Sequence, residues 1–170
     1  FVTDEGLMSL GLTKPTLEEF KNLTNVEVFD KVEADPSLNT LQTAIEVGLN
    51  FKATGVIGFG GGSSMDVAKL VALILGSNED LDSIWGVSNA KGPRLPLVLV
   101  PTTAGTGSEV TPIAIITVDH NEKRGVSSSL ILPDLAILDP ELTLGLPSSI
   151  TAATGIDAMV HAIEGYASFN

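Results

Sequence analysis

The sequence contains no cysteine, few basic residues and no long uninterrupted apolar run. Without cysteine there is no disulfide framework and no thiolate metal site, which fits a reducing compartment, so we expect a cytoplasmic protein. Only 9 Lys and Arg residues stand against 21 Asp and Glu, for a net charge of −12. Because no basic stripe is available to bind phosphates, this balance argues against a nucleic acid or an anionic membrane as partner. Every apolar stretch is too short to span a membrane.

Apolar residues make up 44% of the 170 positions, and charged residues only 18%. This composition predicts a globular domain with a substantial core and excludes a disordered acidic chain. The first residues have no basic region typical of a signal peptide. The sequence begins without methionine, in what looks like the end of a strand, and it stops within a helical pattern. We therefore expect a fragment of a longer protein.

Short apolar runs alternate with helix-like segments along the chain. The pattern predicts strands at 26–29, 55–59, 95–100, 113–118 and 136–138, and helices at 16–24, 37–52 and 64–75. Uninterrupted apolar strands between helices are typical of a mostly parallel sheet buried on both faces, so the fold class is α/β. From residue 148 onward the pattern is purely helical. We predict an α/β domain over residues 1–147 and the first helix of an all-helical domain over 148–170.

A run of three glycines, residues 60–62, joins a predicted strand directly to a predicted helix. Glycine lets a backbone approach a ligand closely, and the first N–H groups of a helix lack partners, so such a turn can bind phosphate. Ser63 or Ser64 can cap the helix or donate to a phosphate oxygen. The spacing is neither the G-x-G-x-x-G fingerprint nor a Walker A loop. A tight turn without a ligand needs fewer glycines, and we therefore favour phosphate binding.

Asp66 and Lys69 fall in the first turns of the same helix. Their i, i+3 spacing is also that of an ordinary surface ion pair. Since a carboxylate would repel a pyrophosphate, we expect Asp66 to face another part of a ligand.

A second polar loop, residues 101–109, follows the strand at 95–100. Ligands of open α/β sheets lie beyond the carboxyl ends of the strands, so both loops are expected to line one crevice. The loop supplies uncharged hydroxyl groups, from Thr102, Thr103, Thr106 and Ser108. It could instead be a loop of small residues that ends in a helix cap, but its place beside the glycine turn favours binding.

Asp4 ends the first strand-like segment. An acidic residue there can bind ribose hydroxyls and repel a 2′-phosphate, which favours NAD over NADP. It can equally be the N-cap of a helix that starts at Glu5.

Asp157 and His161 are four residues apart on the predicted C-terminal helix and share one face, which Glu164 joins. A carboxylate and an imidazole on one face can hold a divalent metal, or they can form an ordinary hydrogen-bonded pair. His120, in a polar turn, is expected to be solvated, so any remaining metal ligands would lie beyond Asn170.

Taken together, these segments resemble the iron-containing (group III) alcohol dehydrogenases over nearly the whole chain. Four blocks in the family's order carry the resemblance: Gly60-Gly61-Gly62-Ser63-x-x-Asp66-x-x-Lys69, the loop 101–109 (PTTAGTGSE), 139–143 (DPELT), and Gly155-x-Asp157-Ala158-x-x-His161-Ala162-x-Glu164. The resemblance implies a Rossmann-like NAD-binding domain, followed by an all-helical metal domain, with the active site in the cleft between them.

The resemblance also implies roles for individual residues. Asp4 would bind the adenosine ribose, and Gly61, Gly62 and Ser63 would hold the pyrophosphate. Asp66 would approach the nicotinamide, and the cofactor would be lined by Thr102, Thr103, Thr106 and Lys123. Asp157 and His161 would be two of four ligands of Fe²⁺ or Zn²⁺, the other two being histidines further downstream, which this sequence does not contain.

The implied activity is a metal-dependent, NAD-linked oxidation of a small alcohol, or reduction of an aldehyde, by a full-length homodimer. The fragment alone is expected to be inactive. One alternative is an enzyme of the glycerol-dehydrogenase or dehydroquinate-synthase branch, although the block from Thr102 to Thr106 argues against it. The other is a non-catalytic NAD-binding module.

Overall fold

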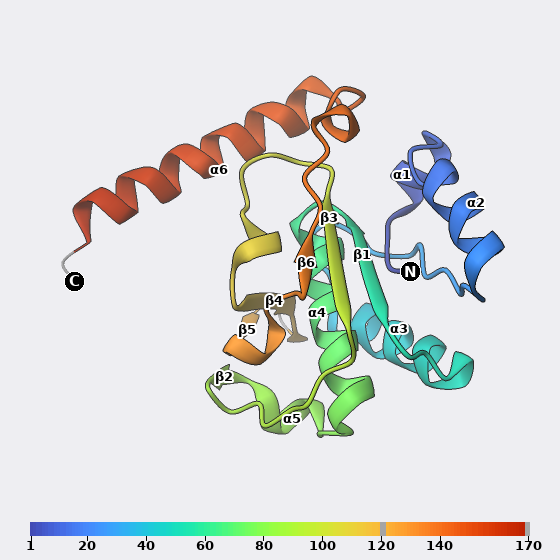
Figure 1. Cartoon of the computed structure of the whole chain (residues 1–170). Helices are drawn as coiled ribbons and strands as arrows, with labels where there is room; N and C mark the ends of the chain where they lie inside the picture. The colour runs from blue at the N-terminus through green and yellow to red at the C-terminus, as the bar shows by residue number, and fades with distance from the viewer. Residues whose placement is uncertain (120–121, 169–170) are drawn as a thin grey trace.

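The computed structural model describes residues 1–119 and 122–168. It confirms the predicted fold class, an α/β structure whose main sheet is parallel and flanked by helices (Figure 1). The sheet has the order β1-β3-β6, formed by Val56–Gly60, Leu97–Pro101 and Leu135–Ala136. Isolated parallel bridges from Val2 to Gly58 and to Phe29 continue this sheet beyond β1. The predicted strand at 26–29 is reduced to the bridge at Phe29.

Helices follow the predicted pattern closely. The longer ones are α2 (Lys14–Leu23), α3 (Leu38–Phe51) and α4 (Gly62–Ser77), and the short ones are α1 (Glu5–Ser9) and α5 (Leu81–Ile84). Single turns of 3₁₀ helix occur at η1 (Ser108–Val110), η3 (Ser129–Ile131) and η4 (Pro140–Thr143). The short elements escaped prediction because three to five residues are too few to show a hydrophobic period.

A second, smaller sheet has the order β2-β5-β4, from Gly86–Val87, Lys123–Ser127 and Ile113–Thr117. The strand predicted at 113–118 is therefore present, but it pairs antiparallel with β5 and lies outside the parallel sheet. Its burial alternates, with Ala114 and Ile116 buried and Ile113 and Ile115 exposed. This alternation of buried and exposed residues cannot be predicted from the sequence, because both faces of the strand carry apolar residues.

Helix α4 lies between the two sheets, with β1 and β3 on one side and β4 on the other (Figure 1). A helix enclosed in this way must be apolar on most of its surface, and Val67, Leu70 and Leu73 are fully buried. Lys69, on the same helix, is the only charged side chain among the described residues that is fully buried.

Helix α6 (Ser148–Ala167) starts where the sequence pattern becomes purely helical, and it extends away from the sheet (Figure 1). None of its residues is buried. The division into domains at residues 147 and 148 remains a prediction. Within the described part of the chain, no helix combines the length and apolar character that crossing a membrane requires.

Gly76 provides a test of the packing of α4. A Cβ at this position would lie 2.5 Å from the carbonyl carbon of Arg94, so Gly76→Ala forces two backbone segments apart. We expect a loss of about 1–3 kcal/mol in the free energy of unfolding, measured in urea. Gly165→Ala, in α6, is the matched control, because nothing lies within 4 Å of its Cβ. Equal stability of the two variants would contradict this close packing.

Candidate functional site

The parallel pairing of β1 with β3 brings the two polar loops together. Gly60 pairs with Pro101, so the glycine turn and the loop at 101–109 leave the carboxyl edge of the sheet at the same level. The N–H of Thr102 donates to the carbonyl oxygen of Gly60 at 3.0 Å. The expected convergence of the loops on one crevice therefore follows from strand register.

The glycine turn leaves the start of α4 open. Gly60 has φ +153°, and a Cβ there would lie 2.7 Å from the Ser64 hydroxyl, so a side chain is excluded. Gly61 is the N-cap of α4, and no side chain caps the helix. The possibility that Ser63 or Ser64 is the cap is thus wrong. The unpaired N–H groups of the first turn, and the positive end of the helix dipole, remain available to an anion.

Thr103 carries a buried hydroxyl oxygen that has no hydrogen-bond partner, one of two such side-chain atoms, with Thr3 Oγ1, among the described residues. The Thr103 Oγ1 would lie 3.6 Å from a Cβ on Gly61, so it adjoins the glycine turn. Leaving a buried hydroxyl unsatisfied costs about 1–3 kcal/mol. A ligand oxygen bound at the turn would remove that cost.

Two adjoining cavities meet at this turn. The first has a volume of about 590 Å³. The second has a volume of about 430 Å³. The first is lined, among others, by Asp4, Gly61, Gly62, Ser63, Thr102 and Thr103. The second is lined by Gly62, Ser63, Asp66, Thr106, Lys123, Asp157 and His161, together with Asp35, Ser108 and the exposed side chains of β4. All the site residues predicted from sequence therefore line one or both of these cavities, whose walls share Gly62 and Ser63.

Asp4 lies at the edge of the first cavity and also caps α1. Its Oδ1 accepts a hydrogen bond from the N–H of Leu7 at 2.9 Å, which confirms the N-cap interpretation. Capping α1 and binding ribose hydroxyls are compatible functions, because a carboxylate has about four acceptor positions. Glu5, Asp30 and Glu33 add further acidic groups to this cavity. Its only basic residue, Lys31, is paired with Glu5.

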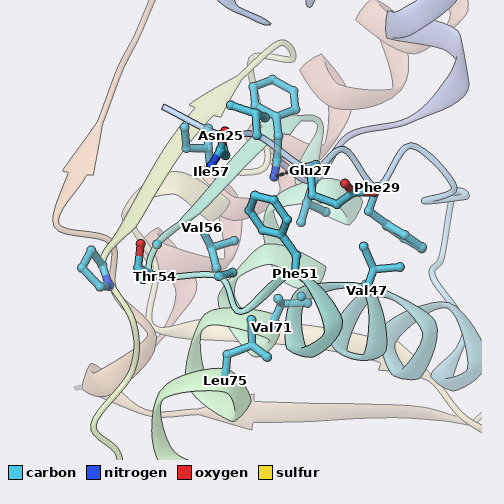
Figure 2. A pocket seen from close by; sticks show the side chains of 18 of the residues that line it. Asn25, Glu27, Phe29, Val47, Phe51, Thr54, Val56, Ile57, Val71 and Leu75 are labelled. Carbon is cyan, nitrogen blue, oxygen red and sulfur yellow. Dashed lines mark hydrogen bonds between the residues drawn. The ribbon is translucent and has the colours of Figure 1, made fainter. Parts of the chain in front are cut away.

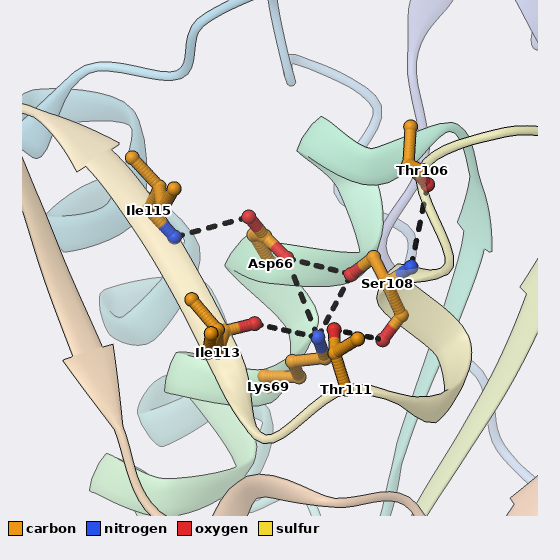
Figure 3. Close-up of polar contacts among 7 residues, drawn as sticks. All are labelled: Asp66, Lys69, Thr106, Ser108, Thr111, Ile113 and Ile115. Carbon is orange, nitrogen blue, oxygen red and sulfur yellow. Dashed lines mark hydrogen bonds and ion pairs between the residues drawn. The ribbon is translucent and has the colours of Figure 1, made fainter. Parts of the chain in front are cut away.

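Asp66, Lys69 and Ser108 form a network that we call the polar clamp (Figure 3). The Lys69 ammonium donates to Ser108 Oγ at 2.8 Å and to the carbonyl oxygen of Ile113 at 2.7 Å, and it lies 3.4 Å from Asp66 Oδ1. The Ser108 hydroxyl donates to Asp66 Oδ1 at 2.7 Å. The other carboxylate oxygen of Asp66 accepts from the N–H of Ile115 at 3.0 Å.

The alternative of an exposed Asp66–Lys69 ion pair is therefore wrong, because Lys69 is fully buried. Burial raises the pKa of the Asp66 carboxyl, and this rise is opposed by Lys69, by the Ser108 hydroxyl and by the N–H of Ile115. Burial likewise lowers the pKa of Lys69, against the attraction of Asp66. The i, i+3 spacing predicted the proximity of the two groups, but their burial depends on η1 and β4.

Helix α6 approaches the second loop closely at Gly105, where a Cβ would lie 1.9 Å from the carbonyl oxygen of Thr154. This contact places Asp157 and His161 over the second cavity. His161 Nε2 lies 3.8 Å from Asp157 Oδ1, beyond hydrogen-bond length. Across the described ranges no group of three or more His, Cys, Asp or Glu side chains could hold a metal ion. The two residues alone therefore do not complete a metal site.

Lys123, at the start of β5, borders the second cavity and forms an ion pair with Asp35. Sequence reasoning missed Asp35 and the side chains of Ile113 and Ile115, since no local pattern links them to the two loops. His120, expected to be solvated, lies outside the described residues.

A third cavity, of about 260 Å³, lies among the N-terminal residues, α3 and the first residues of β1 (Figure 2). Its walls are mostly apolar, with Phe29, Val47, Phe51 and Val56 among them. It adjoins the amino end of β1, opposite the polar loops, and contains none of the predicted site residues.

Known proteins resemble this chain over nearly its whole length. Sulfoacetaldehyde reductase of Bilophila wadsworthia is 40% identical over 168 residues, which cover 97% of this chain and 43% of the relative. The crystal structure of a 1,3-propanediol oxidoreductase superposes with a TM-score of 0.90 at 35% identity, over 97% of this chain and 44% of that one. A sulfoacetaldehyde reductase from Bifidobacterium kashiwanohense, solved in complex with NAD⁺, gives a TM-score of 0.87 at 33% identity, over 97% and 44% of the two chains.

The chain thus spans less than half the length of these relatives. The family model described as iron-containing alcohol dehydrogenase matches residues 1–140. Together with the relatives, this match shows that the chain belongs to the iron-containing alcohol dehydrogenase family.

Proposed function

We propose that this chain supplies the NAD-binding part of a metal-dependent alcohol dehydrogenase that acts on a small alcohol or aldehyde. The observation that carries the proposal is the unpartnered Thr103 hydroxyl beside an uncapped helix start, at the meeting point of two cavities. Buried polar groups are normally hydrogen-bonded within a protein, whereas the Thr103 hydroxyl is left for a ligand that brings oxygen acceptors.

The turn would hold the pyrophosphate of the dinucleotide. The N–H groups of Gly62 and Ser63 and the Thr103 hydroxyl would donate to its oxygens, and the absence of side chains at Gly61 and Gly62 would permit the close approach. In the first cavity, Asp4 would hold the adenosine ribose. The acidic groups around that cavity disfavour a 2′-phosphate, and the cofactor is therefore NAD rather than NADP.

In the second cavity, Asp66 and Thr106 on one side and helix α6 on the other would hold the nicotinamide end. When bound, the nicotinamide ring supplies the hydride acceptor or donor. Asp66 and the side chains of Ile113 and Ile115, which line this cavity, would orient the ring and shield it from water. The similar sulfoacetaldehyde reductase from Bifidobacterium kashiwanohense was solved with NAD⁺, which supports the choice of dinucleotide.

Asp157 and His161 would contribute two ligands to a divalent metal, Fe²⁺ or Zn²⁺. A carboxylate and an imidazole suit either ion. The remaining ligands would come from outside the described residues, because no third His, Cys, Asp or Glu among the described residues joins these two.

Thr103→Val tests the site of pyrophosphate binding. We expect NAD⁺ to bind about tenfold more weakly to the variant, since one hydrogen bond to a charged group is lost. The unliganded protein should be as stable or more stable, by about 1 kcal/mol, because an unsatisfied buried hydroxyl disappears. Calorimetric titration and thermal unfolding measure both, with Thr43→Val on α3 as the control. An unchanged affinity for NAD⁺ would show that Thr103 has no part in the site. A separate outcome concerns the unaltered full-length protein: if it binds NAD⁺ but oxidises no alcohol, it is a non-catalytic NAD-binding module.

Asp4→Asn separates the charge of Asp4 from its capping function, because asparagine caps a helix as well as aspartate does. The ratio of NADP to NAD affinity should rise about fivefold, the effect expected for about 1 kcal/mol of charge repulsion. Thermal stability should be unchanged. Asp80→Asn, at the N-cap of α5, is the matched control. If the ratio stays constant, Asp4 has no part in cofactor choice.

The incomplete ligand set predicts weak metal binding by the 170-residue chain alone. After dialysis against buffered Fe²⁺ or Zn²⁺, elemental analysis should find well below one ion per chain, and the same amount for His161→Ala. One ion per chain, lost in His161→Ala, would show that the chain completes the site unaided.

A further inference from the structure

We propose that Lys69 is a positioning residue for the nicotinamide end of the cofactor: its ammonium group fixes the wall of the second cavity without reaching the cavity itself. The inference rests on the proposed function and assigns a task to a buried group that the proposed binding steps leave unused.

Lys69 ties together three elements that are distant in sequence. Its hydrogen bonds to Ser108 in η1 and to Ile113 in β4 are shorter than its 3.4 Å distance to Asp66 on its own helix. The ammonium is therefore more than an ion-pair partner, since it joins α4, η1 and β4 at one point (Figure 3). Its side chain is fully buried, and it does not line either cavity.

The groups that Lys69 holds form the wall of the second cavity. Ser108 and the N–H of Ile115 occupy opposite oxygens of the Asp66 carboxylate, which fixes the plane of that group. The N–H of Ser108 also donates to Thr106 Oγ1 at 3.3 Å. A shift of Ser108 would therefore move Asp66 and Thr106 together.

A contribution to the free energy of unfolding does not by itself explain why the Lys69 ammonium is buried. Replacing a buried ion pair by apolar side chains of similar size is often neutral or stabilising. The hydrogen bonds of Lys69 go to the cavity wall, whereas the first cavity is built from other residues, Asp4, Gly61, Thr102 and Thr103 among them. Loss of the polar clamp should therefore weaken binding of the nicotinamide end and leave binding of the pyrophosphate and adenosine unchanged.

The test compares NAD⁺ with ADP-ribose, which has the same pyrophosphate and adenosine but no nicotinamide. In the full-length protein, Ser108→Ala should weaken NAD⁺ binding about tenfold, since a buried hydrogen-bonded hydroxyl is lost, and Lys69→Met at least as much. The affinity for ADP-ribose should change less than about twofold, within the effect of an exposed substitution. Lys14→Met, at an exposed lysine of α2, is the control. Calorimetric titration at one pH gives both affinities, and thermal unfolding monitors the fold.

A parallel loss of both affinities in Ser108→Ala would show that the clamp only maintains the fold, and unchanged NAD⁺ binding would show that it has no part in recognition. Either result overturns the inference but leaves the proposed function intact. If Lys69→Met does not fold, Ser108→Ala decides alone, because it removes no charge. If the unaltered protein binds neither ligand, the proposed function fails, and the inference fails with it.

Discussion

The parallel register of β1 and β3 is the constraint on which the other features depend. Pairing of Gly60 with Pro101 makes both strands end at one level, and the two loops must then leave the sheet side by side. The same pairing places the uncapped start of α4 beside the unpartnered hydroxyl of Thr103, so that hydrogen-bond donors from both lie close together. A shift of one residue along either strand would separate these groups by about 3.3 Å and move each side chain of that strand to the opposite face of the sheet.

The burial of Lys69 shows how the smaller sheet contributes to the same region. Helix α4 lies between two sheets, so a polar side chain near its middle must find all of its partners inside the protein. Ser108 and the main chain of β4 supply them. The smaller sheet thereby closes the core and also anchors a polar wall. The apolar interior therefore meets the wall of the second cavity at the buried ammonium of Lys69.

Much of this arrangement could be predicted from local pattern. The strand, the three glycines and the helix are contiguous, so sequence alone orders them, and parallel topology then requires the loop at 101–109 to lie beside the turn. The pairing of β4 with β5 could not be foreseen, because residues 123–127 (KRGVS) are mostly polar and show no strand period. Nor could the burial of Lys69, since Ser108 and Ile113 lie 39 and 44 residues further along the chain. Asp157 and His161 were identified from helical spacing, but their position over the cavity depends on a contact made by Gly105.

That contact has a consequence for the position of helix α6. The main chain of α6 rests directly on residue 105, where even a methyl group would meet the Thr154 carbonyl oxygen at 1.9 Å. Any side chain at 105 would push the helix outward and carry Asp157 and His161 with it. The absence of a side chain at residue 105 thus sets how closely α6, with Asp157 and His161, can approach the loop at 101–109.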